Sequence, residues 1–114
     1  MKLSDVVEQL IIDHRKLTQY ALSRDATEGR HKAILFERVL GFTIENYHDL
    51  VRQLENQCMD AETIFRGENE YGSRYQVDTL IEGANGQKAT VRTGWIVEPE
   101  SKIARLTTLL VLKR

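Results

Sequence analysis

The sequence predicts an α+β fold in which N-terminal helices, arranged as a helical hairpin, pack on one face of a four-stranded antiparallel sheet. Apolar residues in the first half recur at helical spacing, whereas from Glu62 onward the period changes to two, which is typical of strands. Helices followed by a run of strands favour one helical layer on one face of the sheet. We expect a single domain over 1–114, with residues 1–61 helical and residues 62–114 forming the sheet.

The N-terminal segment is expected to begin with a short helix over residues 4–11, which Ser4 can cap. Residues 13–22 then lie over the core, anchored by Leu17, Tyr20 and Leu22.

Two longer helices follow. The first covers Arg30 to Leu40 and closes at Gly41, a residue that favours the left-handed conformation at a helix end. Thr43 caps the second, which runs to about Met59. Because the turn between them is so short, they are expected to form the helical hairpin.

The strands are separated by clear turn signals. A short edge strand is expected over residues 63–66, a longer one around residues 75–82, and its partner over residues 89–97. A three-residue turn with Gly86 in the left-handed conformation would pair Ile81 with Ala89 and Val77 with Thr93. That register gathers the apolar side chains on one face, whereas a two-residue turn would not. Residues 103–112 are apolar on both faces, which favours an inner position in the sheet.

Composition limits the classes of function. The 114 residues are 41% hydrophobic and 29% charged, with 16 Lys and Arg against 17 Asp and Glu. Such a balance is typical of a soluble globular domain, and contact with nucleic acid would require local clustering of positive charge. The single Cys58 excludes an intramolecular disulfide and fits a reducing, cytoplasmic location. No segment has the roughly 20 apolar residues that span a membrane, and we expect no signal peptide.

The first candidate site consists of polar side chains on the last two strands: Arg92, Thr93, Arg105 and Thr108. Arginine offers a planar fork of donors that suits phosphate oxygens, and threonine adds hydroxyls. The alternative is structural: Arg92 pairs with Asp78, and Arg105 stacks on Trp95.

The second candidate site is the sequence Gly29-Arg30-His31-Lys32 at the start of a predicted helix. Basic residues oppose the helix dipole at this position, which is a hint of function. His31 is suited to acid–base chemistry near neutral pH. The alternative is a solvated basic turn, and the cluster formed by residues 14–16 has the same ambiguity.

Metal and cofactor chemistry is not expected. The histidines lack the spacing of metal ligands, and Glu100-Ser101-Lys102 lies in a loop that would not hold a metal site rigidly. Cys58 lies on an apolar helix face and is interpreted as a core residue.

Six ordered motifs resemble a bacterial family of about 110 residues that is still described as a domain of unknown function. They are K-L-T-x-Y-x-L from Lys16, G-R-H-K-A-x-x-F from Gly29, L-G-F-T-x-x-N-Y from Leu40, Y-G-x-R-Y-x-V from Tyr71, V-R-T-G-W-I from Val91 and R-L-T-T from Arg105. That family occurs free-standing and at the C-terminus of polymorphic toxins.

The predicted layout is also similar to the barnase, EndoU, colicin and RelE ribonuclease group. This resemblance implies a metal-independent endoribonuclease that uses the ribose 2′-hydroxyl, with catalytic residues Lys32, His31, Arg92, Thr93, Arg105 and Thr108. His31 or Lys32 would transfer protons and the arginines would stabilise charge. Substrate binding would fall to Lys16, Arg15, Arg30, Trp95 and Tyr75.

The partners implied are RNA and a small cognate antitoxin or immunity protein, and a homodimer is left open. The competing hypothesis is a non-catalytic interaction module, such as an antitoxin, an inhibitor or a phage accessory protein, that binds a protein partner through the last strand.

Overall fold

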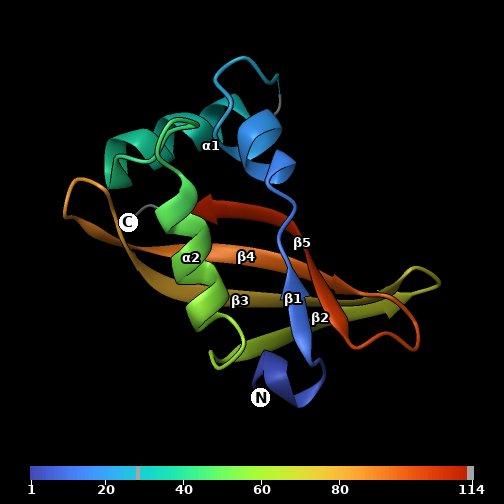
Figure 1. Ribbon diagram of the computed structural model, residues 1–114. Helices are drawn as coiled ribbons and strands as arrows, with labels where there is room; N and C mark the ends of the chain where they lie inside the picture. Colours follow the sequence, from blue (N-terminus) through green and yellow to red (C-terminus); the bar gives the residue numbers. More distant parts are fainter. Residues whose placement is uncertain (28, 113–114) are drawn as a thin grey trace.

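The computed structural model describes residues 1–27 and 29–112. Its elements follow the order η1 (Leu3–Asp5), β1 (Gln9–Ile11), η2 (Leu17–Ala21), α1 (Arg30–Leu35), η3 (Phe36–Leu40), α2 (His48–Gln57), β2 (Thr63–Asn69), β3 (Gly72–Glu82), β4 (Lys88–Val97) and β5 (Ile103–Val111). In Figure 1 the segments η2, α1 and η3 gather beyond β5, whereas η1 lies near the N-terminus at the opposite end of the sheet. None of the helices in the described part of the chain has the length and apolar character needed to cross a membrane.

The sheet within the described residues has five strands in the order β1-β5-β4-β3-β2. β1 runs parallel to β5, with Gln9 opposite Ile103, and the other pairs are antiparallel. The prediction of a four-stranded antiparallel sheet was therefore wrong, as was the helix expected over residues 4–11. Pairing with β1 satisfies backbone groups at the edge of β5, which a helix at residues 9–11 would leave without partners.

The predicted helical hairpin was also wrong. The helix predicted over residues 30–40 exists as the consecutive segments α1 and η3, and Gly41 closes it with a φ of 70°. However, α2 begins only at His48, because side chains hold the chain before it in a turn. Asn46 Oδ1 accepts a hydrogen bond from the Thr43 amide at 2.7 Å, and such local bonds compete with helix formation.

The two helical stretches of the predicted hairpin, α1–η3 and α2, contact different strands of the sheet, and α1 also contacts η2. η3 contacts β4 and β5, whereas α2 contacts β3. In Figure 1, α2 crosses the strands and α1 lies beyond β5.

The hairpin of β3 and β4 has the predicted register. Ile81 pairs with Ala89, Val77 pairs with Thr93, and Gly86 adopts a φ of 82°. β5 is an inner strand, as its apolar sequence predicts, and β2 is the edge strand expected near residue 63.

Trp95 lies at the centre of the core, beneath the helical layer, with 1% of its surface exposed. Its indole Nε1 donates a hydrogen bond to Thr93 Oγ1 at 2.8 Å. The Thr93 hydroxyl in turn donates to the carbonyl oxygen of Val77 at 2.7 Å. The buried indole N–H therefore has its partner within the same strand, which removes the cost of burying an unsatisfied donor.

Replacement of Thr93 by valine leaves the buried indole N–H without an acceptor. We expect the free energy of unfolding to fall by about 1–3 kcal/mol, the usual cost of an unsatisfied buried group. Urea unfolding of the wild-type and Thr93→Val proteins measures this cost. In a Trp95→Phe background, which has no indole N–H, the same substitution should cost less. An equal cost in both backgrounds would show that the indole does not depend on Thr93.

Candidate functional site

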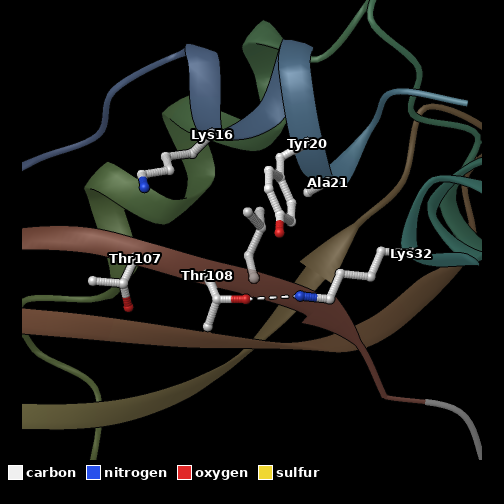
Figure 2. Close-up of a pocket in the computed structure, with 7 residues that line it drawn as sticks. Lys16, Tyr20, Ala21, Lys32, Thr107 and Thr108 are labelled. Atoms are coloured by element: carbon white, nitrogen blue, oxygen red, sulfur yellow. Dashed lines mark hydrogen bonds between the residues drawn. The ribbon is translucent and has the colours of Figure 1, made fainter. Parts of the chain in front are cut away.

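A cavity of about 270 Å³ lies beside β5, beyond the end of β1. Its lining residues come from η2 and the residue before it, from α1 and from β5: Lys16, Tyr20, Ala21, Lys32, Thr107, Thr108 and Leu109. Figure 2 shows the side chains of Lys16 and Tyr20 above the two threonines of β5, with Lys32 beside Thr108. We call this space the lysine cavity.

The electrostatic character of the lysine cavity is positive. Lys32 Nζ donates a hydrogen bond to Thr108 Oγ1 at 2.9 Å, a contact between the first turn of α1 and the last strand (Figure 2). Lys16 supplies a second ammonium group, and no described residue of the lining carries a carboxylate. Two ammonium groups and two threonine hydroxyls together provide donors for an anion such as a phosphate.

A β-bulge in β5 places the two threonines. Gly94 pairs with Thr108 but Trp95 pairs with Leu106, so Thr107 is the extra residue opposite β4. Gly94 allows this close approach, since a Cβ there would lie 2.9 Å from Thr108 Cγ2 and 3.2 Å from Thr107 Oγ1. The bulge therefore lets the hydroxyl-bearing Thr107 and Thr108, two consecutive residues of β5, line the same cavity.

A second hollow, of about 250 Å³, lies on the sheet face opposite the helices. Its lining includes three arginines beside Gly94 and the bulge: Arg66, Arg74, Arg92, Gly94, Thr107 and Thr108. We call it the arginine hollow. Thr107 and Thr108 line both spaces, so the lysine cavity and the arginine hollow meet at the bulge.

The two predicted sheet arginines are each paired with an acid. Arg92 makes two hydrogen bonds of 3.0 Å to the carboxylate of Asp78, and this contact raises the pKa of Arg92 above its ordinary value. Arg105 Nε lies 3.4 Å from Glu98 Oε1. The structural alternative therefore holds for Arg92, whereas the expected stacking of Arg105 on Trp95 was wrong, because Trp95 is buried and Arg105 is exposed.

Other predicted site residues lie apart from the lysine cavity. Thr93 and Trp95 are buried under the helical layer, and half-buried Tyr75 packs its ring 5.6 Å from that of Phe65. Arg30 and His31 are exposed at the start of α1.

Arg15 holds the carboxylate of Asp13 at 2.7 Å, and hydrogen bonds from Arg15 lower the pKa of Asp13 to about 2. The structure thus brings Lys16, Lys32 and Thr108 together, and separates them from Arg105 and the buried Thr93.

Sequence reasoning missed Arg66, Arg74 and Thr107 as lining residues. Arg74 and Asp78 lie four residues apart on β3, so the alternation of the strand places both side chains on the face away from the core. The sequence therefore contained a signal that could have identified Arg74. Arg66 and Thr107 had none, because both sit at register shifts that only strand pairing determines.

A cluster of aromatic rings adjoins α2. His14 Nδ1 lies 2.9 Å from the Tyr47 hydroxyl, and the Tyr47 ring stacks on that of His48 with centroids 4.3 Å apart.

The described residues include no group of three or more His, Cys, Asp or Glu placed to hold a metal ion.

Cys58 is unsuited to act as a nucleophile. Its side chain is buried, with Sγ 3.9 Å from Thr93 Oγ1. Burial raises the pKa of the thiol to about 11, although the contact with Thr93 acts in the opposite direction. The thiol therefore stays protonated and inaccessible near neutral pH.

The comparisons with known proteins agree with this fold. The model of a family described as a domain of unknown function (DUF6883) matches residues 2–113. A chain of the contact-dependent growth inhibition toxin–immunity protein complex from Klebsiella pneumoniae 342 has a similar structure, with a TM-score of 0.71 and 15% identity. The likeness covers 91% of this chain and 94% of that one. At such identity it shows the fold alone. No curated protein matches the chain at a significant level.

The expected resemblance to a family of unknown function is thereby confirmed. The likeness to the barnase, EndoU, colicin and RelE group stays a prediction.

The burial of Cys58 predicts how its thiol reacts. A thiol with a pKa of about 11 is almost entirely protonated at pH 8, and the reactive species is the thiolate. We expect negligible labelling of the native protein by a thiol reagent at pH 8, and one labelled thiol per chain after unfolding in urea. Rapid labelling of the native protein would contradict the buried position of this side chain.

Proposed function

The chain belongs to the DUF6883 family, and we propose that this member is a toxin domain that cleaves RNA without a metal ion. The observation that carries the proposal is the lysine cavity: Lys32 donates to Thr108 inside a space whose described lining has a second lysine and no carboxylate. The toxin–immunity neighbour supports a toxin or immunity role for this fold.

The lysine cavity suits a phosphodiester better than a neutral ligand. Its ammonium groups attract phosphate oxygens, and partial enclosure strengthens that attraction relative to open water. The chain as a whole has a net charge of −1, so its attraction for RNA has to be local.

The proposed reaction is transfer of the phosphodiester to the adjacent ribose hydroxyl. The 2′-oxygen forms a bond to phosphorus, and the bond from phosphorus to the 5′-oxygen breaks. The 2′-hydroxyl loses its proton, and the leaving 5′-oxygen gains a proton. In this scheme the Lys32 ammonium donates that proton, and a water molecule accepts the 2′-hydroxyl proton. His31, predicted from the sequence as a second proton carrier, is given no role here because it lies apart from the lysine cavity. Lys16 stabilises the charge that develops on the phosphate.

This scheme uses only part of the predicted catalytic set. Thr108 positions the Lys32 ammonium through their hydrogen bond. Arg92, Arg105 and Thr93 are given no catalytic role, because the first two hold carboxylates and the third holds the indole of Trp95.

The proposal includes a protein partner of the toxin–immunity type, because the structural neighbour belongs to a complex of a toxin with its immunity protein. Such a partner would restrain the activity by covering the lysine cavity.

A second candidate is a non-catalytic module that acts by binding a protein. Exposed apolar side chains on the edge strand β2 and the turn after it favour this candidate: Ile64 is 49%, Phe65 52% and Tyr71 66% exposed. Apolar groups on an unpaired edge mark sites where another chain can dock.

Controlled expression in bacteria tests the catalytic proposal. The wild-type chain should arrest growth and fragment RNA into products with cyclic phosphate ends, and the purified chain should do the same to RNA in the presence of a metal chelator. Lys32→Ala should lower the cleavage rate by about 10²-fold or more, the usual contribution of a positioned proton donor. Lys88→Ala, which removes an exposed lysine at the start of β4, is the matched control and should leave cleavage unchanged.

Thermal unfolding of both variants checks that each is folded. Intact RNA and normal growth at high expression of the wild-type chain would overturn the catalytic proposal and favour the protein-binding candidate.

A further inference from the structure

The sheet face opposite the helices carries guanidinium groups from three adjacent strands. Arg66 lies on β2, Arg74 on β3 and Arg92 on β4, and all three line the arginine hollow. The register brings the first two close together, since Gly67, the neighbour of Arg66, pairs with Arg74. The hollow exists because Gly94 contributes no side chain to this face.

The three arginines differ in how their charge is balanced. Arg92 is held by Asp78 in a pair of hydrogen bonds, which leaves it little freedom to bind another anion. Arg66 and Arg74 are exposed, and neither forms an ion pair with a carboxylate of the described residues. Two like charges on neighbouring strands repel one another, and an anion bound between them would relieve that repulsion.

The arginine hollow shares two lining residues with the lysine cavity. Thr107 and Thr108 line both, and the β-bulge that contains them lies where β5 has passed the end of β1. On the side away from β4, no strand of the described residues pairs with β5 beside the bulge. A chain-like ligand can therefore pass from one space to the other over the two hydroxyl groups.

We propose that the arginine hollow is a second binding site for the RNA backbone, in which Arg66 and Arg74 hold phosphates next to the one bound in the lysine cavity. Guanidinium forks fit phosphate oxygens, and a groove that bends around a strand edge fits a flexible single strand better than a folded protein. This inference rests on the proposed function for the identity of the ligand. It adds a path for the RNA and a role for two residues outside the reacting centre.

The test measures equilibrium binding to 2′-O-methyl oligonucleotides, which lack the attacking hydroxyl and stay intact. A single-stranded dodecamer should bind the Arg66→Ala/Arg74→Ala protein about tenfold more weakly than the wild type at low salt. Its logarithmic salt slope should fall by about 1.4, because each single-strand phosphate contact contributes about 0.7. A dinucleotide, which fills only the lysine cavity, should bind both proteins equally.

The matched control is Arg38→Ala/Arg52→Ala, which removes two exposed arginines from η3 and α2 in the helical layer. It changes the net charge equally and should leave dodecamer binding within about twofold of wild type, as expected for charges that make no phosphate contact. An equal loss in the control would overturn the inference, because the effect would then depend on net charge alone. Unchanged dodecamer binding in the Arg66/Arg74 variant would also overturn it.

An acidic twelve-residue peptide distinguishes the other ligand class. If the Arg66/Arg74 variant loses the peptide but keeps the dodecamer, the arginine hollow binds an acidic protein and the inference is wrong. The result is independent of catalysis: if wild-type protein cleaves no RNA yet the variant loses dodecamer affinity, the proposed reaction fails and the binding site stands. If the wild type cleaves RNA and the variant binds the dodecamer normally, the proposed reaction stands and the second binding site is ruled out.

Discussion

The close approach of β4 and β5 at Gly94 is the constraint on which the surface of this protein depends. A side chain at this position would press on Thr108 Cγ2 at 2.9 Å, so the β-bulge of Thr107 and Thr108 requires glycine opposite it or a shift of the threonine. The bulge turns Thr108 toward Lys32, and the missing side chain leaves the arginine hollow open. One residue without a Cβ thus shapes two neighbouring basic spaces. The buried pair of Thr93 and Trp95 fixes the other face of the same strand.

The features that local chemistry determines could be predicted from the sequence. The Gly86 turn set the register of β3 and β4, and with it the pairing of Asp78 and Arg92, because a change of one residue would turn apolar side chains toward solvent. Gly41 could likewise be predicted to end the helix over residues 30–40, because glycine readily adopts the left-handed conformation found there. The expectation that Lys32 and Thr108 belong to one site also agrees with the geometry, although their catalytic roles stay proposals.

The features that depend on distant pairing could not be predicted. The three residues of β1 carry no strand signal of their own, and their partner lies more than ninety residues later in β5. Arg92 and Thr93 were predicted in one site, but adjacent residues of a strand face opposite sides, so Arg92 holds Asp78 while the buried Thr93 side chain holds Trp95. Arg66 and Thr107 were missed because bulges reverse the local alternation, and a bulge forms only when two strands meet.

The proposed ligand, an anionic RNA backbone, binds where the lysine cavity and the arginine hollow share Thr107 and Thr108. Backbone amide chemical shifts during titration with a 2′-O-methyl oligonucleotide test it most directly. We expect the largest shifts at Thr107 and Thr108, with further shifts at Lys32 and Arg74. Shifts confined to Ile64 and Phe65 on the β2 edge, or no shifts at all, would contradict it.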